Sequence, residues 1–567
     1  MHIVDWLILS GILGFVVVWS IYKSSRRSRS STMHDFVLSG KEARWYTVAI
    51  SIMATQASAI TFISLPGQAY VDGMRFIQAY FGLPLAMVLL CIIALPLYHR
   101  LDVLTAYEFL ERRFDTKTRT LAALLFLLQR SLAAAISLYA PSIVLSLLLG
   151  WDVRSVITLI GVLVILYTTS GGTRAVSWAQ SSQMAIIAFG MISVGIVVVY
   201  SLPSDVSLRD ALCVAAVSGK LNTIDFTFDL NNKYTVWSGL LGGLFLQLSY
   251  FGTDQSQVQR YLSGESLTQS RLGLLFNGIM KIPMQFGILL IGALLFVFYQ
   301  FTPPPIFFNH AEIAKLQHTH YKAEYQHIAA KFQQVSIEQQ NTLRRYLHAL
   351  HTGNITEQAM LTQVLHTHAE HLHSLKVQVR SLLKRNDPRA VTNDTNYIFL
   401  TFVITYLPIG LVGLLIAVVF SASMSSASSE INALASTTVI DIYRRLLHGS
   451  LSEERSVWVT RLATIMWGAI VVGFAQLMDS LGSLIEAVNV VGSLFYGAIL
   501  GIFFTAFFLK RASGTAVFCA TLLTEAIVLA LYAFSPITFL WYNLIGCLLV
   551  VLCTWLLSRL FHIFEIA

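Results

Sequence analysis

About 13 segments of the sequence are apolar and long enough to cross a lipid bilayer, which restricts the chain to a membrane fold. Only 12% of the residues are charged and 55% are hydrophobic, whereas soluble proteins carry roughly 25% charged residues. The sequence therefore predicts an all-α polytopic membrane protein embedded in a lipid bilayer. The expected spans lie near residues 3–22, 46–71, 76–98, 120–149, 154–170, 179–202, 236–253, 272–300, 397–424, 457–478, 483–509, 514–534 and 538–558.

Basic residues indicate how these spans are oriented. Loops on one predicted side hold about 20 Lys and Arg, and the short loops on the other side hold about five, so the N-terminus is expected outside and the C-terminus in the cytoplasm. The cluster Lys23, Arg26, Arg27 and Arg29 follows the first span, an order opposite to that of a signal peptide. We expect a plasma-membrane protein, typical of a bacterial inner membrane. The net charge of +8 sets topology and indicates no nucleic-acid partner.

The run FSASMSSASSEINALASTTVIDIYRR at 420–445 follows an apolar stretch long enough to span a membrane. On a helix, Ala422, Ser425, Ser426 and Ser429 fall on one face. Serine oxygens at membrane depth suit a hard monovalent cation, which needs oxygen ligands to replace its water. Close packing of transmembrane helices explains the same small residues, so this run alone leaves both interpretations open.

Two further segments mix hydroxyl, amide, glycine and proline residues inside predicted spans, at 51–67 and 242–260. A broken transmembrane helix frees backbone groups that protein, ion or cavity water must satisfy. One interrupted segment near the start of each half of the span set predicts a secondary transporter with an inverted repeat.

The chain resembles the sodium:solute symporter family over residues 5–300 and 396–534. The motifs that carry the resemblance occur in the family's order: MATQASAITFISLPGQAYVDG at the second span, TAYEFLERRFD at 105–115, YTTSGGTRAVSWAQSSQ at 167–183, GTDQSQVQRYLSG at 252–264, and the serine run ending in DIYRR. The family includes sodium-coupled carriers of sugars, proline, sialic acid, iodide, monocarboxylates and vitamins.

The resemblance implies a five-plus-five inverted-repeat transporter core that is LeuT-like. An extra helix at 1–22 precedes the first repeat at 46–202; the second repeat covers 236–509 and is interrupted by 301–395, and further helices fill 514–567. It also implies a sodium site that joins the first and eighth core helices. The carbonyls of Ala54, Ala57 and Ala422 and the hydroxyls of Ser425 and Ser426 are the ligands carried over, with sodium as coupling ion and no other cofactor.

The sequence departs from the family at the position of a possible second cation site. Relatives often have an aspartate in a W-T-D-x-x-Q motif, and Gln180 stands at that position here. The remaining candidate ligands are Ser428 and Ser429, with Glu430 as a substitute carboxylate. Without a carboxylate, two cations in a low-dielectric site would repel each other strongly. The sequence therefore predicts one sodium ion per substrate.

The resemblance also places a substrate cavity beside the broken helices. Its expected lining is Gln56, Ser58, Thr61, Gln78, Tyr80, Gln247, Tyr250 and Asn489, with Glu486 as a looser candidate. Tyr250 is expected to close the inner side of the site, and Asp254 and Arg260 are expected either to pair in an inner-gate network or to face the cytosol. Interhelical hydrogen bonding is the alternative role for each polar residue. Since amides and hydroxyls outnumber charges, we expect a small, polar, neutral or zwitterionic solute.

Charges inside membrane spans are functional candidates because they are costly. Here they are Arg130, Lys281, Glu430, Glu486 and Glu525. We expect Arg130 and Lys281 to lie near helix ends and extend their charges toward the surface, and Glu525 to be structural.

The polar stretch 301–395 is expected to be an extracytoplasmic helical insert, and it holds ten of the fifteen histidines. His366, His368, His371 and His373 could bind zinc or nickel, but a solvated helical hairpin is the favoured interpretation because sequence cannot show closed ligand geometry. The five cysteines form no CxxC pattern and predict no metal site.

The sequence favours a sodium-coupled symporter that imports a solute by alternating access. A proton-coupled carrier of the same fold, with Glu430 or Glu486 as proton site, and a transporter-like sensor remain as alternatives. A membrane enzyme ranks last, because the sequence contains no HExxH, GxSxG or P-loop motif.

Overall fold

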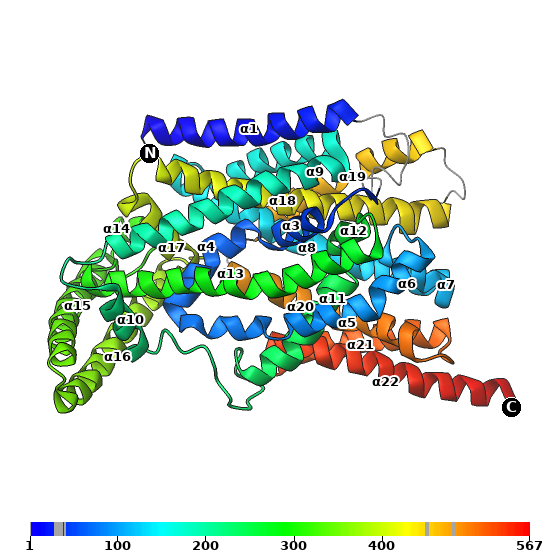
Figure 1. The fold of residues 1–567 in the computed structure, drawn as a ribbon. Coiled ribbons are helices and arrows are strands. Elements are labelled where there is room, and N and C mark those ends of the chain that lie inside the picture. Colours follow the sequence, from blue (N-terminus) through cyan, green and yellow to red (C-terminus); the bar gives the residue numbers. More distant parts are fainter. Residues whose placement is uncertain (1, 28–37, 39–40, 448–452, 479–482, 567) are drawn as a thin grey trace.

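The computed structural model describes residues 2–27, 38, 41–447, 453–478 and 483–566, and all statements below refer to these residues. Nine of the described helices are long and apolar enough to cross a membrane, and three shorter helices are also apolar. Long helices lie side by side as a bundle, and a helical hairpin covers one end of it (Figure 1). The predicted all-α membrane fold is confirmed.

The first half of the chain builds the following helices. They are α1 (Ile3–Arg27), α3 (Trp45–Gln56), α4 (Ala59–Asp72), η2 (Gly73–Tyr80), α5 (Leu83–Ile92), α6 (Ala94–Leu101), α7 (Ala106–Arg113), α8 (Thr116–Leu149), α9 (Val153–Tyr200), α10 (Leu208–Val217), η3 (Ser238–Gly242), α11 (Gly243–Gly252) and α12 (Gln255–Leu262).

The second half begins with the long helix α13, and the hairpin helices α14–α16 follow it. The bounds are α13 (Leu267–Phe301), α14 (His310–Gln317), α15 (Lys322–His351), α16 (Ile355–Asn386), α17 (Thr395–Tyr406), α18 (Leu411–Thr437), η4 (Thr438–Leu447), α19 (Glu453–Gln476), α20 (Leu484–Phe508), α21 (Gly514–Phe534) and α22 (Phe539–Ile566). We call the end of the bundle that carries α14–α16 the outer end, following the predicted orientation (Figure 1).

The helix α9 is a single helical run of 48 residues, where the sequence predicts two spans with a loop at 171–178. A straight helix of this length would measure about 72 Å, more than twice the bilayer core. Its first half instead runs antiparallel to α19 and its second half antiparallel to α18, so α9 crosses the bundle twice. The contacts that show this pair Thr158 with Gln476, Ile165 with Gly468, Gln180 with Ser429 and Gly190 with Val418.

The expected span at 397–424 is wrong, because the structure divides it. The helix α17 ends at Tyr406 and α18 begins at Leu411. Pro408 lacks a backbone donor, and Gly410 has a φ of 93° that other residues rarely adopt. The Asp5 carboxylate of α1 then accepts hydrogen bonds from the Gly410 and Gly413 amides, at 2.7 and 3.1 Å. The serine run consequently lies within the span of α18 and not after it.

The insert forms the helical hairpin that the sequence predicts. Helices α15 and α16 pack along each other, and α14 contacts both. Their apolar faces share a small core of their own, which includes Phe332, Leu375 and Val379. Within the described residues no three His, Cys, Asp or Glu side chains are placed to hold a metal ion.

Candidate functional site

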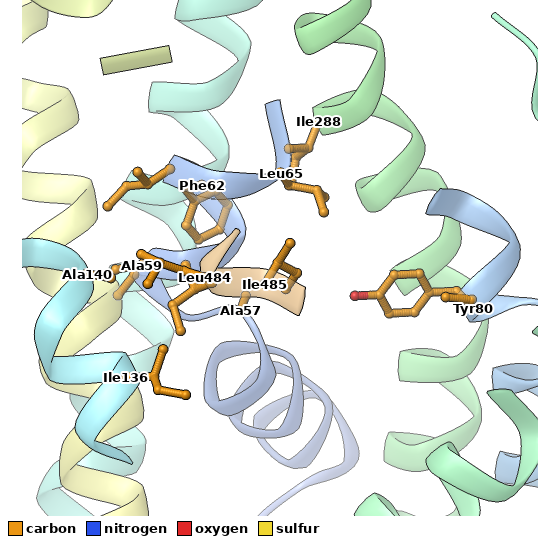
Figure 2. Close-up of a cluster of buried hydrophobic side chains, with 14 of the residues drawn as sticks. Ala57, Ala59, Phe62, Leu65, Tyr80, Ile136, Ala140, Ile288, Leu484 and Ile485 are labelled. Carbon is orange, nitrogen blue, oxygen red and sulfur yellow. The ribbon is translucent and has the colours of Figure 1, made fainter. Parts of the chain in front are cut away.

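The predicted interruption of the first core helix lies at the centre of the bundle. The helix α3 ends at Gln56, Ala57 has a non-helical conformation with a ψ of 74°, and α4 begins at Ala59. The last turn of a helix leaves carbonyl groups without intrahelical partners, and Ala54 lies in that turn. Figure 2 shows Ala57 and Ala59 between the two helical segments, with Leu484 and Ile485 of α20 beside them. Polar backbone atoms are therefore freed in an apolar surrounding.

The serine face of α18 lies directly against this interruption. The Ser426 hydroxyl donates a hydrogen bond to the Thr55 carbonyl at 3.3 Å, which connects α18 to the last turn of α3. The Ser425 hydroxyl is buried and has no hydrogen-bond partner among the described residues. Ala422 is fully buried on the same face. A buried hydroxyl usually has a partner, so Ser425 has an oxygen ligand available for a cation.

Gln180 occupies the region of the predicted second cation site. Its side-chain nitrogen donates to Thr55 Oγ1 and to Ser429 Oγ, both at 3.0 Å, and its oxygen accepts from Ser51 Oγ at 2.6 Å. The hydroxyls of Ser428 and Ser429 both donate to the carbonyl of Ser425, at 3.1 and 2.9 Å. A neutral amide thus connects α3, α9 and α18 where relatives often have a carboxylate.

A cavity of about 90 Å³ opens beside the interruption. Seven of the eight predicted substrate residues line it, namely Gln56, Ser58, Thr61, Tyr80, Gln247, Tyr250 and Asn489. The lining also includes five residues that are not among the predicted ones, namely Gln129, Arg130, Ser137, Glu430 and Tyr496. The adjacent pair Gln129–Arg130 in the apolar α8 was the available signal, since polar residues at that depth are expensive.

Gln78 is the predicted cavity residue that the structure places elsewhere. Its side-chain nitrogen donates to the Tyr234 carbonyl at 2.9 Å, and its oxygen accepts from the Asp225 amide at 3.0 Å. Gln78 therefore fixes the chain segment before η3 to the outer part of the bundle. The alternative of interhelical hydrogen bonding describes this residue better than solute binding.

Arg130 organises the charged part of the cavity. Its guanidinium pairs with Asp254 of the α11–α12 junction and, at 3.0 Å, with Glu430 of α18, and it donates to the Tyr496 hydroxyl at 2.7 Å. The prediction that Arg130 reaches toward the surface is wrong, since the residue is 3% exposed. Two carboxylates around one guanidinium compensate its desolvation. The guanidinium also lies 5.4 Å from the centre of the Tyr250 ring.

Two residues of the predicted inner gate, Asp254 and Tyr250, lie beside Arg130. Asp254 caps α12 by accepting from the Ser256 amide at 2.9 Å, and it pairs with Arg130. Tyr250 lies beside this group and accepts a hydrogen bond from Gln257 at 2.6 Å. Arg260 is buried one turn or more farther along α12. Asp254 and Tyr250 therefore share one cluster with Arg130.

Glu486 lies outside the cavity lining, in a second polar cluster at its outer side. The Glu486 carboxylate accepts from Tyr234 at 2.9 Å, from Lys233 at 2.8 Å and from Gln68 at 3.3 Å. These contacts join α20 to α4 and to the segment before η3. The position of Glu486 agrees with a role in holding the outer side together.

Lys281 and Glu525 are both buried charged residues. Lys281 on α13 is fully buried and lies 6.0 Å from the centre of the Tyr80 ring, so the prediction that it extends to the surface is also wrong. Glu525 on α21 is 8% exposed, and neither carboxylate oxygen has a hydrogen-bond partner within the described part of the chain.

Comparisons with known proteins show which family the chain resembles. The profile of the sodium:solute symporter family matches residues 36–332 and 323–524. The chain is 26% identical to sodium-coupled monocarboxylate transporter 1 of Xenopus laevis over 499 residues, which cover 88% of this chain and 67% of that protein. It is 25% identical to the sodium/sialic acid symporter SiaT of Proteus mirabilis over 563 residues, 98% of this chain and 95% of SiaT.

A solved structure shows the same fold. It is a substrate-bound, outward-open state of a Na⁺-coupled sialic acid symporter, which matches with a TM-score of 0.74 and 24% identity and covers 98% of both chains. The likeness confirms the inverted-repeat transporter architecture that the sequence predicts.

Proposed function

The chain belongs to the sodium:solute symporter family and is a sodium-coupled solute symporter, and on that premise we propose where its coupling ion binds. The site lies between the α3–α4 interruption and the serine face of α18. Its ligands are the carbonyls of Ala54, Ala57 and Ala422 and the hydroxyls of Ser425 and Ser426.

The observation that carries this proposal is the unpartnered Ser425 hydroxyl. It is 2% exposed, and an unsatisfied buried polar group costs about 1–3 kcal/mol. A sodium ion, with its requirement for oxygen ligands, removes that cost and links the two helices at the same time. The Ser426 hydroxyl donates a hydrogen bond to the Thr55 carbonyl at 3.3 Å, so the second hydroxyl ligand lies beside the last turn of α3.

We further propose a stoichiometry of one sodium ion per substrate. Gln180 supplies no charge to the region of Ser428 and Ser429, and its amide already makes three hydrogen bonds there. Glu430 is the remaining carboxylate near these serines, and it pairs with Arg130. A second cation at Ser428 and Ser429 would therefore lack a carboxylate ligand of its own.

The solute that fits the central cavity is small and polar, and it is neutral or zwitterionic. Arg130 already pairs with two carboxylates, Asp254 and Glu430, so the charged cluster offers no free positive charge to an anionic ligand. Side-chain oxygens of Gln56, Gln129 and Gln247 have no partners among the described residues and favour a solute with hydroxyl or ammonium donors. The cavity volume of about 90 Å³ is smaller than that of common ligand pockets, whose volumes begin at roughly 300 Å³. Binding therefore requires widening, which alternating access provides.

Coupling follows from a shared conformation. Sodium at the α3–α18 junction stabilises the arrangement in which the cavity is open outward, and solute binds to the same arrangement. The solute is released inward when the outer cluster around Glu486 closes and the inner cluster around Arg130 opens. In the cell, one charge moving through 100 mV supplies roughly 2.3 kcal/mol.

Charge displacement on solid-supported membranes tests the site without knowledge of the solute. Reconstituted wild-type protein should show a saturable sodium-dependent signal. Ser425→Ala and Ser426→Ala should each raise the half-saturating sodium concentration about tenfold, because each removes one direct oxygen ligand. Ser436→Ala is the matched control, since this α18 hydroxyl bonds within its own helix to Ala433 at 3.1 Å. Unchanged sodium dependence in both ligand variants would contradict the assignment.

A further inference from the structure

A larger cavity than the central one lies beneath the insert hairpin, at the outer end of the bundle. Its volume is about 300 Å³, which reaches the lower limit of common small-molecule sites. Residues from five places in the chain line it: the end of α4, the segment after α10, the end of α13, and the facing sides of α15 and α16. The insert and the transporter core thus each contribute one wall.

The charged lining of this outer cavity is exclusively basic among the described residues. Lys220, Lys376 and Arg380 line it together with His366 and His373, and no carboxylate belongs to the lining. Asp394, outside the lining, accepts from Arg380 at 3.4 Å. The basic groups therefore outnumber the acidic groups that compensate them.

Lys376 is the basic residue whose charge is least compensated. Its ammonium lies between two aromatic rings, 5.8 Å from the centre of Tyr70 and 5.7 Å from that of Phe332. No ion pair or hydrogen bond of Lys376 occurs within the described structure. Burial lowers the pKa of Lys376, and Asp394 opposes that shift only in part. Burial also lowers the pKa of Lys220 to about 8, and the neighbouring Lys376 adds to this effect.

Three further hydrogen-bond donors in the lining have no partner in the described part of the chain. They are the hydroxyl of Tyr299, the side-chain nitrogen of Gln340 and Nε of Arg380, and all three atoms are buried. Buried donors are rarely left unsatisfied. Residues of α13, α15 and α16 thus bring unpartnered donors to the lining of one cavity, together with a lysine ammonium.

The wall between these donors is aromatic. Tyr70, Phe296 and Phe332 line the cavity, and the Lys220 ammonium lies 4.7 Å from the centre of the Phe296 ring. A ligand that satisfies the whole lining carries negative charge on one side and an apolar or aromatic body on the other.

We propose that the outer cavity is a second ligand site, separate from the central one, that binds a small organic carboxylate with an aromatic or apolar body. The carboxylate pairs with Lys376 and accepts hydrogen bonds from Tyr299 and Gln340, and its body packs on Phe296 and Phe332. Because insert and core both provide contacts, the occupied site holds the hairpin against the ends of α4 and α13.

Binding of benzoate to the purified full-length protein tests this site, with benzamide as its uncharged counterpart. Titration calorimetry in choline chloride, without sodium, should show saturable benzoate binding and at least tenfold weaker benzamide binding, because a hydrogen-bonded charge pair is lost. Lys376→Gln should weaken benzoate about tenfold or more, and Tyr299→Phe, which removes only the hydroxyl, about threefold. Lys384→Gln, an exposed lysine of the same helix, should bind like wild type.

Two results would overturn the proposal. One is benzoate binding that requires sodium and disappears in Ser425→Ala, which would place the ligand in the central cavity. The other is benzoate affinity equal to that of benzamide, or unchanged in both Lys376→Gln and Tyr299→Phe. The melting temperature of each variant without ligand identifies a folding defect, and Tyr299→Phe keeps the test decisive if Lys376→Gln is destabilised. The titrations in choline chloride do not depend on the assignment of the sodium site.

Discussion

The interruptions at α3–α4 and at α11–α12 both free backbone groups in the interior of the bundle, but different chemistry surrounds them. Around Ala57 the side chains are apolar (Figure 2), the polar groups beside the last turn of α3 are neutral hydroxyls and amides, and the Ser425 hydroxyl has no partner among the described residues. At the other interruption Asp254 caps α12 with its own carboxylate and is neutralised by Arg130. The second interruption is therefore satisfied within the protein, while the first is the place where we propose a cation.

The largest expected effect comes from removing the internal charge of the α11–α12 junction. Arg130→Gln leaves Asp254 and Glu430 buried without their cation, which should lower the free energy of unfolding by about 3–5 kcal/mol. Thermal melting of the detergent-purified protein measures this loss. Arg344→Gln is the control, because its partner Asp205 is exposed and such pairs contribute about 1 kcal/mol or less. If both variants melt alike, Arg130 does not neutralise a buried cluster.

Asp254→Asn should have a smaller effect on stability and none on sodium. Arg130 keeps Glu430 as a partner at 3.0 Å, and the amide oxygen can still cap α12, so we expect a loss of about 2 kcal/mol. The half-saturating sodium concentration, measured by charge displacement, should stay at the wild-type value. A shift as large as that of Ser425→Ala would show that the two interruptions both bind cations and would remove the contrast between them.

Gln180→Asp sharpens the contrast by adding the charge that the first interruption lacks. A carboxylate at this position faces Ser429 and Thr55, and its attraction for a cation in a low-dielectric site is strong. We expect the number of sodium ions per substrate to rise from one to two, as measured by reversal potentials of reconstituted protein with an identified solute. Gln180→Asn, which adds no charge, should keep a ratio of one. A ratio of two in the wild type would refute the single-ion proposal.

Tyr250→Phe is expected to have the smallest effect. The variant loses the hydrogen bond from Gln257, 2.6 Å long, but keeps a ring that packs against Tyr496 with centroids 6.0 Å apart. The expected loss of stability is about 1 kcal/mol, measured by thermal melting, with the sodium dependence unchanged. Tyr250→Ala, which removes the ring as well, should cost about 3 kcal/mol or more. Equal losses would mean that the ring does not pack in the cluster.

Features that depend on local residue pattern and on depth in the membrane can be predicted from the sequence. Helix-breaking residues in 51–67 indicated the interruption at Ala57, and the 3.6-residue period placed Ser425 and Ser426 on one face of α18. Seven of the eight expected substrate residues line the central cavity. Pro408 and Gly410 also indicate the division of 397–424, but the apolar length of the segment favours a single span.

Features that depend on distant partners could not be predicted. The depth of Arg130 in the bundle depends on two carboxylates, and Asp254 and Glu430 lie 124 and 300 residues away in sequence. The partners of Asp5 and Gln78 could not be predicted either. Asp5 of α1 accepts a hydrogen bond from the Gly410 amide before α18, and Gln78 donates to the Tyr234 carbonyl, but nothing in their local sequence identifies these partners. The basic outer cavity arises only when the insert folds back on α4 and α13.

The most direct test of the sodium site is the melting temperature of purified protein in sodium, compared with choline and potassium, for wild type and Ser425→Ala. A ligand that binds only the folded state stabilises it, by about 2.7 kcal/mol at one hundred times its dissociation constant. We predict a sodium-specific, saturable rise in the wild type that Ser425→Ala loses, while both proteins melt alike in choline. A wild-type protein whose melting temperature is the same in sodium and choline would contradict a sodium ion at the α3–α18 junction.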